Sequence, residues 1–257
     1  MTSADQLLDI ARQAATHVIG PLQAARADTE LAVETKSSGS DLVTAMDRWV
    51  EQTLVEFLTA QRPDDGIIGE EGSTRVSRSG VEWVLDPIDG TTNFVRDLPG
   101  FSVSIAARQD GHEVAGLVVD PIRNEWFEAS ADGGARVNGS PLSVSEPKDL
   151  SHSLIATGFS YDANQRQAQG ELLTHLLPHV ADIRRFGGAA IDCCGVAAGR
   201  FDAYFETGLQ DWDIAAGSLI VRQAGGLTFD FRRSGGPFVA VAPNIADPLL
   251  AVLGLSR

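Results

Sequence analysis

Apolar and polar positions alternate along the first half of the chain in two different periods. Apolar residues three and four positions apart predict amphipathic helices over residues 4 to 25 and 42 to 60. Further along, the apolar segments Ser102 to Ala107 and Glu113 to Val119 predict strands, and Asp110-Gly111 between them is typical of a hairpin turn. The first half therefore combines helices with an antiparallel sheet.

The second half alternates short strands with helices. We expect strands at 154 to 157, 203 to 205, 227 to 231 and 238 to 242, and helices at 165 to 177, 189 to 198, 213 to 224 and 246 to 254. Such alternation is typical of a sheet covered by helices. Because Asn138 to Pro147 forms a transition, we expect two halves, 1–145 and 146–257.

Candidate catalytic and metal-binding residues follow one apolar segment, Val81 to Leu85. This segment predicts a buried strand that ends on Asp86. Pro87 is expected to stop this strand, because proline lacks an N–H and has a fixed φ. Asp89-Gly90-Thr91 follows, where a short helix can begin. Paired carboxylates can bind a hard cation, and free N–H groups can bind phosphate. The segment indicates metal-assisted chemistry on a phosphate ester, although alone it equally fits an Asp-Pro turn before a helix cap.

Two other acidic positions lie far from this segment in the sequence. Glu70-Glu71 follows an apolar pair, and adjacent side chains on a strand point to opposite faces, so one of them can enter a site. Asp213 precedes the apolar run Ile214 to Val221 and is expected to be the N-cap of a helix. Taken singly, a solvated Glu pair and a capping Asp explain these features better than metal ligands do.

Taken together, these segments resemble the signature blocks of the inositol monophosphatase family, which comprises metal-dependent, lithium-sensitive sugar-phosphate phosphatases. The matching segments are Glu70-Glu71, Trp83 to Phe94, Trp212 to Gly217, and a fourth block made of Lys36-Ser37-Ser38 and Asp41 to Asp47. They stand in the family's order over roughly residues 5 to 250. The resemblance implies an α/β fold, a five-layer αβαβα sandwich of the inositol monophosphatase and fructose bisphosphatase type, and a homodimer. Most metal ligands would lie in the N-terminal half.

The resemblance also assigns roles to individual residues. Two or three Mg²⁺ ions, with Mn²⁺ as an alternative, would be bound by Glu70, Asp86, the Ile88 carbonyl, Asp89 and Asp213. Thr91, with Glu70 or Asp47, would orient the attacking water, and Asp47 would lie near a weaker third metal site. The phosphate would meet the N–H groups of Gly90 and Thr91 and the side chain of Lys36, although a lone Lys is usually only solvated.

The substrate beyond its phosphate is less constrained by the sequence. Gly188 and Ala189 resemble the small residues that let a ring alcohol approach the backbone, although Gly187-Gly188 replaces the family's commoner hydroxyl-bearing pattern. Glu206 resembles a carboxylate that accepts hydrogen bonds from sugar or cyclitol hydroxyls. We expect inositol monophosphate as the substrate. Histidinol phosphate, fructose 1,6-bisphosphate and a 3′-phosphoadenosine nucleotide remain alternatives, as does the role of some bacterial relatives as RNA-polymerase-associated factors.

The overall charge agrees with a metal-dependent site. The 257 residues include 20 basic and 35 acidic side chains, for a net charge of −15, and 43% of them are apolar, as in ordinary globular proteins. Direct nucleic-acid binding is not expected, since it needs a basic surface. An acidic site would repel a small-molecule phosphate ester unless a divalent cation inverts the local field.

The cysteines, the length of the apolar runs and the N-terminal residues indicate the cellular compartment of the protein. Cys193 and Cys194 are adjacent in an apolar helical run, so an ordinary disulfide between them is not expected, and no Cys/His cluster indicates zinc. No apolar run approaches the roughly 18 residues of a membrane span. Asp5 and Asp9 interrupt the early apolar residues, unlike in a signal peptide. We expect a cytoplasmic protein without membrane contact.

Overall fold

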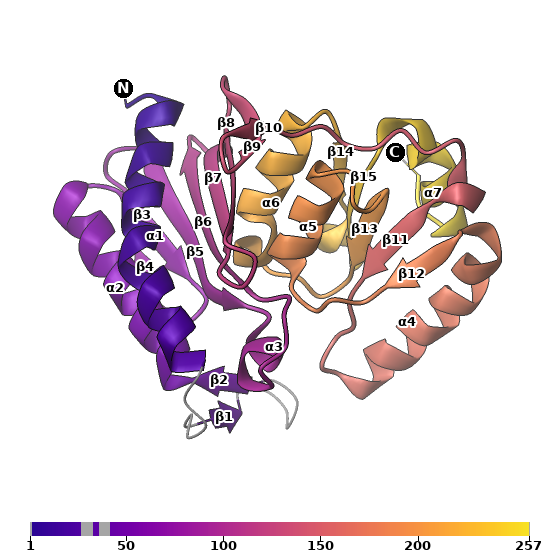
Figure 1. Cartoon of the computed structure of the whole chain (residues 1–257), viewed down its shortest axis with the longest axis horizontal. Coiled ribbons are helices and arrows are strands. Elements are labelled where there is room, and N and C mark those ends of the chain that lie inside the picture. The colour runs from indigo at the N-terminus through magenta and orange to yellow at the C-terminus, as the bar shows by residue number, and fades with distance from the viewer. Residues whose placement is uncertain (1, 27–32, 36–41, 257) are drawn as a thin grey trace.

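The computed structural model describes residues 2–26, 33–35 and 42–256. Two sheets alternate with three layers of helices (Figure 1). Helices α1 (Ala4–Arg26) and α2 (Ala45–Gln61) cover the larger sheet, α5 (Ala189–Ala197) and α6 (Asp211–Gln223) lie between the sheets, and α4 (Ala163–Leu176) and α7 (Ala246–Val252) lie outside the smaller sheet. The expected αβαβα sandwich is confirmed.

The larger sheet has eight strands in the order β10-β9-β8-β7-β6-β5-β3-β4. Their bounds are β3 Gly66–Gly69, β4 Thr74–Arg75, β5 Val81–Asp89, β6 Ser102–Gln109, β7 His112–Asp120, β8 Glu125–Ser130, β9 Gly134–Val137 and β10 Ser140–Pro141. Strands β6 and β7 form the expected hairpin, because Asp110 and Gly111 both adopt positive φ, 52° and 83°. Apolar residues on both faces of the central strands are buried, since helices cover each side.

Strand β5 does not stop at Pro87 as the sequence suggests. It continues to Asp89, and its register against β6 shifts between Asp86 and Asp89. A proline cannot donate to the neighbouring strand, and a bulge accommodates it without ending the strand. The expected strand end was therefore wrong, and the bulge itself carries both carboxylates.

Helix α2 begins three residues later than expected. Residues Leu42–Thr44 form strand β2, which pairs with β1 (Val33–Thr35). Thr44 then caps α2, because its hydroxyl accepts the N–H of Met46 and of Asp47 while Asp47 accepts the N–H of Thr44 in return. This capping box fixes the Asp47 carboxylate at the start of the helix.

The smaller sheet has five strands in the order β12-β11-β13-β15-β14. Their bounds are β11 Leu154–Thr157, β12 Asp182–Arg184, β13 Ala203–Glu206, β14 Leu227–Asp230 and β15 Phe238–Val241. Strand β12 was not expected from the sequence. Within the described part of the chain, the short helices are α3 Thr91–Val95, η1 Leu150–His152, η2 Leu177–His179, η3 Arg232–Ser234 and η4 Pro243–Ile245. The chain passes from the larger to the smaller sheet between Pro141 and Leu154, and the division into two halves stays a prediction.

The two central helices are largely buried because sheets cover both of their sides. Every residue of α5 is buried, including Cys193 and Cys194, whose thiols are free. In α6, Ile214 to Val221 are buried. In the described part of the chain, no helix combines the length and the apolar character that crossing a membrane requires.

Candidate active site

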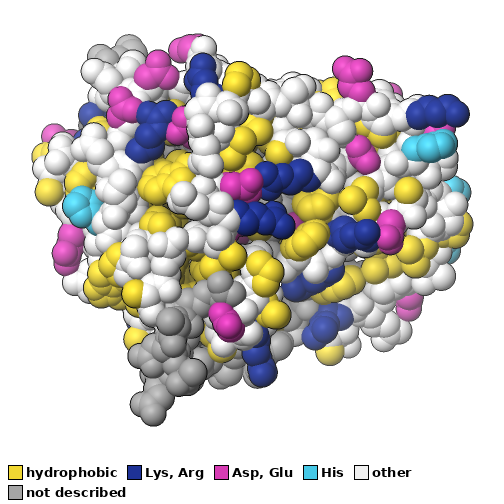
Figure 2. All heavy atoms as spheres, viewed as in Figure 1, with side chains coloured by type: hydrophobic (Ala, Val, Ile, Leu, Met, Phe, Trp, Pro, Cys, Tyr) yellow, Lys and Arg dark blue, Asp and Glu magenta, His cyan; other side chains and the backbone are white. Residues whose placement is uncertain are grey.

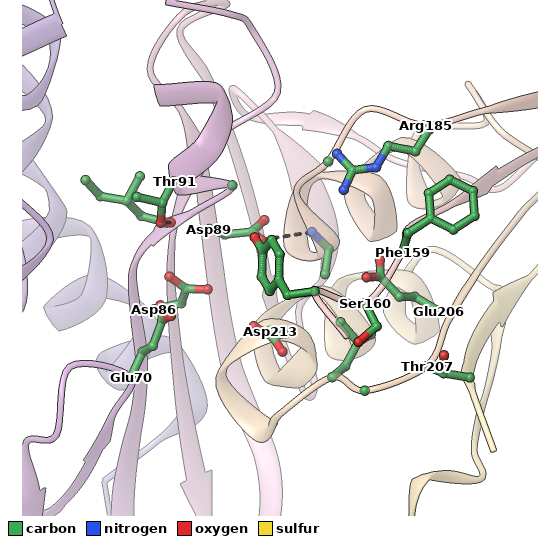
Figure 3. Close-up of a pocket in the computed structure, with 17 residues that line it drawn as sticks. Glu70, Asp86, Asp89, Thr91, Phe159, Ser160, Arg185, Glu206, Thr207 and Asp213 are labelled. Atoms are coloured by element: carbon green, nitrogen blue, oxygen red, sulfur yellow. Dashed lines mark hydrogen bonds between the residues drawn. The ribbon is translucent and has the colours of Figure 1, made fainter. Parts of the chain in front are cut away.

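A pocket of about 160 Å³ opens where the two sheets meet the central helices (Figure 3). Strand β5 and helix α3 line one wall, and the starts of α5 and α6 with the end of β13 line the other. Among the described residues, the charged side chains of its wall are Glu70, Asp86, Asp89, Arg185, Glu206 and Asp213. All but Arg185 are acidic, so the pocket repels anions unless cations occupy it.

Asp86 carries the strongest indication of a cation. It is 1% exposed, and its Oδ1 is buried without a hydrogen-bond partner among the described residues. Burial raises its pKa well above the ordinary value, and the charges of Glu70, Asp89 and Asp213 raise it further. A buried carboxylate oxygen without a partner is costly, and a bound hard cation would supply the missing contact. The described acidic, His and Cys residues nevertheless contain no group of three placed to hold an ion as they stand.

Asp89 joins the two walls of the pocket. Its Oδ1 accepts the N–H of Ala189 at 2.9 Å, and its Oδ2 accepts the N–H of Ala190 at 2.9 Å and the hydroxyl of Ser102 at 3.2 Å. The carboxylate thus caps α5 from strand β5 (Figure 3). Burial raises its pKa to about 6, although these backbone donors act in the opposite direction.

Thr91 and Asp47 form a second hydrogen-bonded unit beside the pocket. The Thr91 hydroxyl lies 3.1 Å from Asp47 Oδ1 and 3.0 Å from the Ile88 carbonyl oxygen. One hydroxyl carries one proton, so these two acceptors compete for it. Asp47 Oδ2 is held by the N–H of Thr44 at 2.7 Å and its hydroxyl at 2.5 Å. Thr91 is 8% exposed and presents its oxygen at the pocket wall.

Glu51, a residue of α2 that is 2% exposed, was not predicted from the sequence. Its Oε2 accepts the N–H of Glu71 at 2.8 Å, and its Oε1 accepts the N–H of Ser73 at 3.0 Å. A Cβ at position 69 would lie 2.4 Å from Glu51 Oε2, so Gly69 permits this approach. Glu51 thereby fixes the turn that presents Glu70. The available signal was a carboxylate within the apolar face of a helix.

Asp213 enters the pocket from α6 but is not the N-cap of that helix. The helix begins at Asp211 with Gln210 as N-cap, and Asp213 Oδ2 accepts the Gln210 N–H at 2.6 Å. The expected cap position was therefore wrong by three residues, because the side chain caps from the third helical position. Burial raises the pKa of Asp213 well above the ordinary value, and the charges of Asp89, Glu70 and Glu206 add to this effect.

The residues expected to contact the alcohol part of the substrate lie on the wall opposite Asp86 (Figure 3). Glu206 Oε2 accepts the hydroxyl of Tyr204 at 2.8 Å, and burial raises the Glu206 pKa to about 7. Gly188 is the N-cap of α5, and Ala189 opens that helix beside Asp89. Lys36 falls outside the described residues.

Nine of the predicted site residues line this one pocket. They are Glu70, Asp86, Ile88, Asp89, Gly90, Thr91, Ala189, Glu206 and Asp213. Asp47 stands behind Thr91, and Gly188 adjoins the pocket through α5. The sequence motifs are thus brought together in space, while the roles of the individual residues stay predictions.

Comparisons with known proteins agree with this arrangement. The model of the inositol monophosphatase family matches residues 3–250. The Nus factor SuhB of Pasteurella multocida is 45% identical over 223 residues, which cover 84% of this chain and 84% of that protein. The inositol-1-monophosphatase SuhB of Mycobacterium tuberculosis strain H37Rv is 45% identical over 239 residues, which cover 88% of this chain and 82% of that protein.

The fold is shared as well. The crystal structure of the extragenic suppressor protein suhB from Bartonella henselae superposes with a TM-score of 0.90 at 35% identity, covering 96% of this chain and 98% of that one. The family model extends over both sheets and every acidic residue of the pocket. The chain therefore belongs to the inositol monophosphatase family.

Proposed function

We propose that this chain is an Mg²⁺-dependent phosphoric monoester hydrolase and that its substrate is inositol monophosphate. Membership of a phosphatase family supports the reaction class. The observation that carries the metal requirement is Asp86 Oδ1, which is buried without a partner beside three other carboxylates. Such a cluster is stable at neutral pH only if protons or cations offset its charge.

Glu70, Asp86, Asp89, Asp213 and the carbonyl of Ile88 would hold two or three ions. Their donor atoms are all oxygen, which suits Mg²⁺ and also Mn²⁺. When bound, the metal offsets the charge of the carboxylates and of the phosphate and makes a water molecule more acidic. The donor set fits the ion in its chemistry, and ion binding would draw the carboxylates closer together.

Thr91 and Asp47 would prepare the attacking water. While the Thr91 hydroxyl donates its proton to Asp47, its oxygen can accept a hydrogen from a water molecule in the pocket. That contact fixes the orientation of the water, and Glu70, which lines the same wall of the pocket, can accept its other proton. Asp47 keeps its place because Thr44 holds its second oxygen.

The substrate would lie between the two walls. The N–H groups of Gly90 and Thr91 would hold the phosphate, together with Lys36. Gly188 and Ala189 leave room for the alcohol, and Glu206 accepts hydrogen bonds from its hydroxyl groups.

A panel of phosphate esters tests this proposal. Phosphate release is measured in saturating Mg²⁺ with inositol monophosphate, histidinol phosphate, fructose 1,6-bisphosphate and a 3′-phosphoadenosine nucleotide. We expect the highest kcat/KM with inositol monophosphate. A higher kcat/KM with another ester would reassign the substrate, and release from none of them would refute the hydrolase.

A second candidate function is a regulatory contact with RNA polymerase. The observation that favours it is the relative named Nus factor SuhB, at 45% identity. A cytoplasmic location, which the two free buried thiols support, would bring the partners together. The net charge of −15 favours a protein contact over direct nucleic-acid binding. Co-sedimentation with purified RNA polymerase tests this contact. The variant Asp86→Asn separates it from catalysis, because it should lose phosphatase activity and still bind the polymerase.

We also propose that the chain forms a homodimer. Leu98, Ile122 and Phe186 are exposed at 50%, 36% and 37%. Figure 2 shows apolar and basic side chains mixed across the middle of one face of the molecule. Light scattering on the purified protein tests the dimer, and a monomeric mass over micromolar concentrations would exclude it.

A further inference from the structure

One wall of the pocket contains the carboxylate of Glu206, which accepts a hydrogen bond from a buried side chain of the same strand. Tyr204 and Glu206 are two residues apart on strand β13, so both side chains point to the same face of the sheet. Tyr204 is 0% exposed, and its hydroxyl donates to Glu206 Oε2 at 2.8 Å. Burial keeps the pKa of this hydroxyl well above its ordinary value, so Tyr204 remains a donor across the physiological range.

Gly158 provides the space for this arrangement. It follows strand β11, which pairs in parallel with β13 so that Thr157 lies opposite Phe205. A Cβ at position 158 would lie 1.7 Å from Glu206 Oε2 and 2.5 Å from its Oε1. The carboxylate therefore lies directly over the Cα of Gly158, and no side chain larger than hydrogen fits beneath it.

The second oxygen of Glu206 is left for another partner. Oε1 has no hydrogen-bond partner among the described residues, and Glu206 lines the pocket across from Asp86 (Figure 3). Since Tyr204 and Gly158 together fix the carboxylate, Oε1 is an acceptor in one defined place. An acceptor fixed in this way distinguishes a substrate that offers a hydroxyl there from one that does not.

We propose that Tyr204 is a positioning residue, which holds Glu206 over Gly158 so that the pocket selects phosphate esters of polyols. This inference rests on the proposed function and deepens it, because it names the structural basis of the substrate class. Tyr204 itself does not touch the substrate. It acts through Glu206, and its effect should appear in the binding of the alcohol rather than in the chemistry at phosphorus.

The variant Tyr204→Phe tests the proposal with two substrates, inositol monophosphate and phenyl phosphate, which lacks the hydroxyl groups. We expect the ratio of the two kcat/KM values to fall about tenfold, the size of one weakened hydrogen bond to a charged group. The fall should come from a higher KM for inositol monophosphate, with kcat changing less. An unchanged ratio, or equal losses on both esters, would overturn the proposal.

Two further variants separate positioning from general damage. Gly158→Ala places a methyl group against the Glu206 carboxylate and should lower the same ratio, even if Tyr204→Phe folds poorly. Thr157→Val is the matched control, because it also removes a buried hydroxyl that donates a hydrogen bond to β13. The Thr157 hydroxyl donates at 2.8 Å to the carbonyl of Phe205, which lies between Tyr204 and Glu206 on that strand. It should lower the melting temperature without moving the ratio. A similar fall in Thr157→Val would show that the effect is structural.

The wild-type enzyme distinguishes this inference from the proposed function. If it releases phosphate from neither ester, both are wrong. If it hydrolyses phenyl phosphate but not inositol monophosphate, polyol selection is wrong and hydrolysis stands. If it hydrolyses both and Tyr204→Phe leaves the ratio unchanged, the positioning role alone is wrong.

Discussion

Asp89 and Ala189 are 100 residues apart in the sequence, yet the carboxylate of one accepts the backbone N–H of the other at 2.9 Å. This bond links the bulge of β5 to the first turn of α5. Asp89 therefore has two tasks, because it caps a helix of the second half and contributes charge to the pocket. Any substitution at Asp89 should disturb both tasks, though to different degrees.

For Asp89→Asn, we predict a loss in kcat of about 10²-fold or more, the scale of removing a key electrostatic group. The fold should survive with a lower melting temperature, because Asn keeps one acceptor for Ala189 while its NH₂ group faces the other donors of α5. Steady-state kinetics over a Mg²⁺ series, together with thermal unfolding, measure the two effects. Near-normal activity at low Mg²⁺ would mean that Asp89 is only a cap.

Glu51→Gln should impair a site that Glu51 does not touch. The amide of Gln can accept from only one of the N–H groups of Glu71 and Ser73, so the turn that presents Glu70 loosens. We predict a higher Mg²⁺ requirement and a lower kcat. The matched control is Glu56→Gln, an exposed position on the same helix. Equal behaviour of the two variants in a Mg²⁺ titration would remove Glu51 from the account.

Metal-free protein should lose stability as the pH rises from about 4 to 6, the range between the ordinary and the raised pKa of Asp89. Burial raises the pKa of Asp89 to about 6 and those of Asp86 and Asp213 well above their ordinary values. Above its unfolded pKa, each group binds more protons in the folded state than in the unfolded state, so stability falls with pH until the folded pKa is passed. Each group changes stability by at most about 1.4 kcal/mol per pH unit.

Added Mg²⁺ should reverse this loss, because it binds the ionised carboxylates of the folded state. Thermal unfolding in EDTA and in Mg²⁺ at pH 5 and pH 8 measures the effect. We predict a larger rise in melting temperature at pH 8 than at pH 5. An equal rise at both pH values would show that these carboxylates do not bind the ion.

Lithium should inhibit the enzyme after the substrate has bound. Li⁺ is small and hard, so it can occupy a weak oxygen site in place of Mg²⁺ while carrying half the charge. Initial rates over a grid of Li⁺ and inositol monophosphate concentrations should give an uncompetitive pattern. A competitive pattern, or no inhibition at tens of millimolar Li⁺ (roughly the range for weak hard-cation sites), would assign the chain to a different branch of the family.

Local spacing explains which parts of the site the sequence could predict. Asp86, Asp89 and Thr91 lie within one short segment, so their proximity follows from the chain itself. Glu51 was missed because its partners lie 20 and 22 residues away and are backbone N–H groups, which no side-chain pattern reveals. The length of β5 was misjudged because a bulge, which depends on the neighbouring strand, accommodates Pro87.

The link between Tyr204 and Glu206 was closer to being predictable. Residues two apart on a strand share a face, so the pairing follows once the expected strand over 203 to 205 is extended by one residue to Glu206. The hydrogen bond itself depends on Gly158, which the parallel pairing of β11 and β13 brings beneath the carboxylate. The sequence alone does not reveal that register.

The most direct test of the central claim is phosphate release from inositol monophosphate by protein that has been stripped with EDTA and then dialysed. We predict no turnover until Mg²⁺ is added, and full recovery afterwards. Asp86→Asn should fail to recover under the same conditions, because the amide has no negative charge with which to bind the ion. Full activity of the stripped wild-type enzyme in excess EDTA would contradict the account.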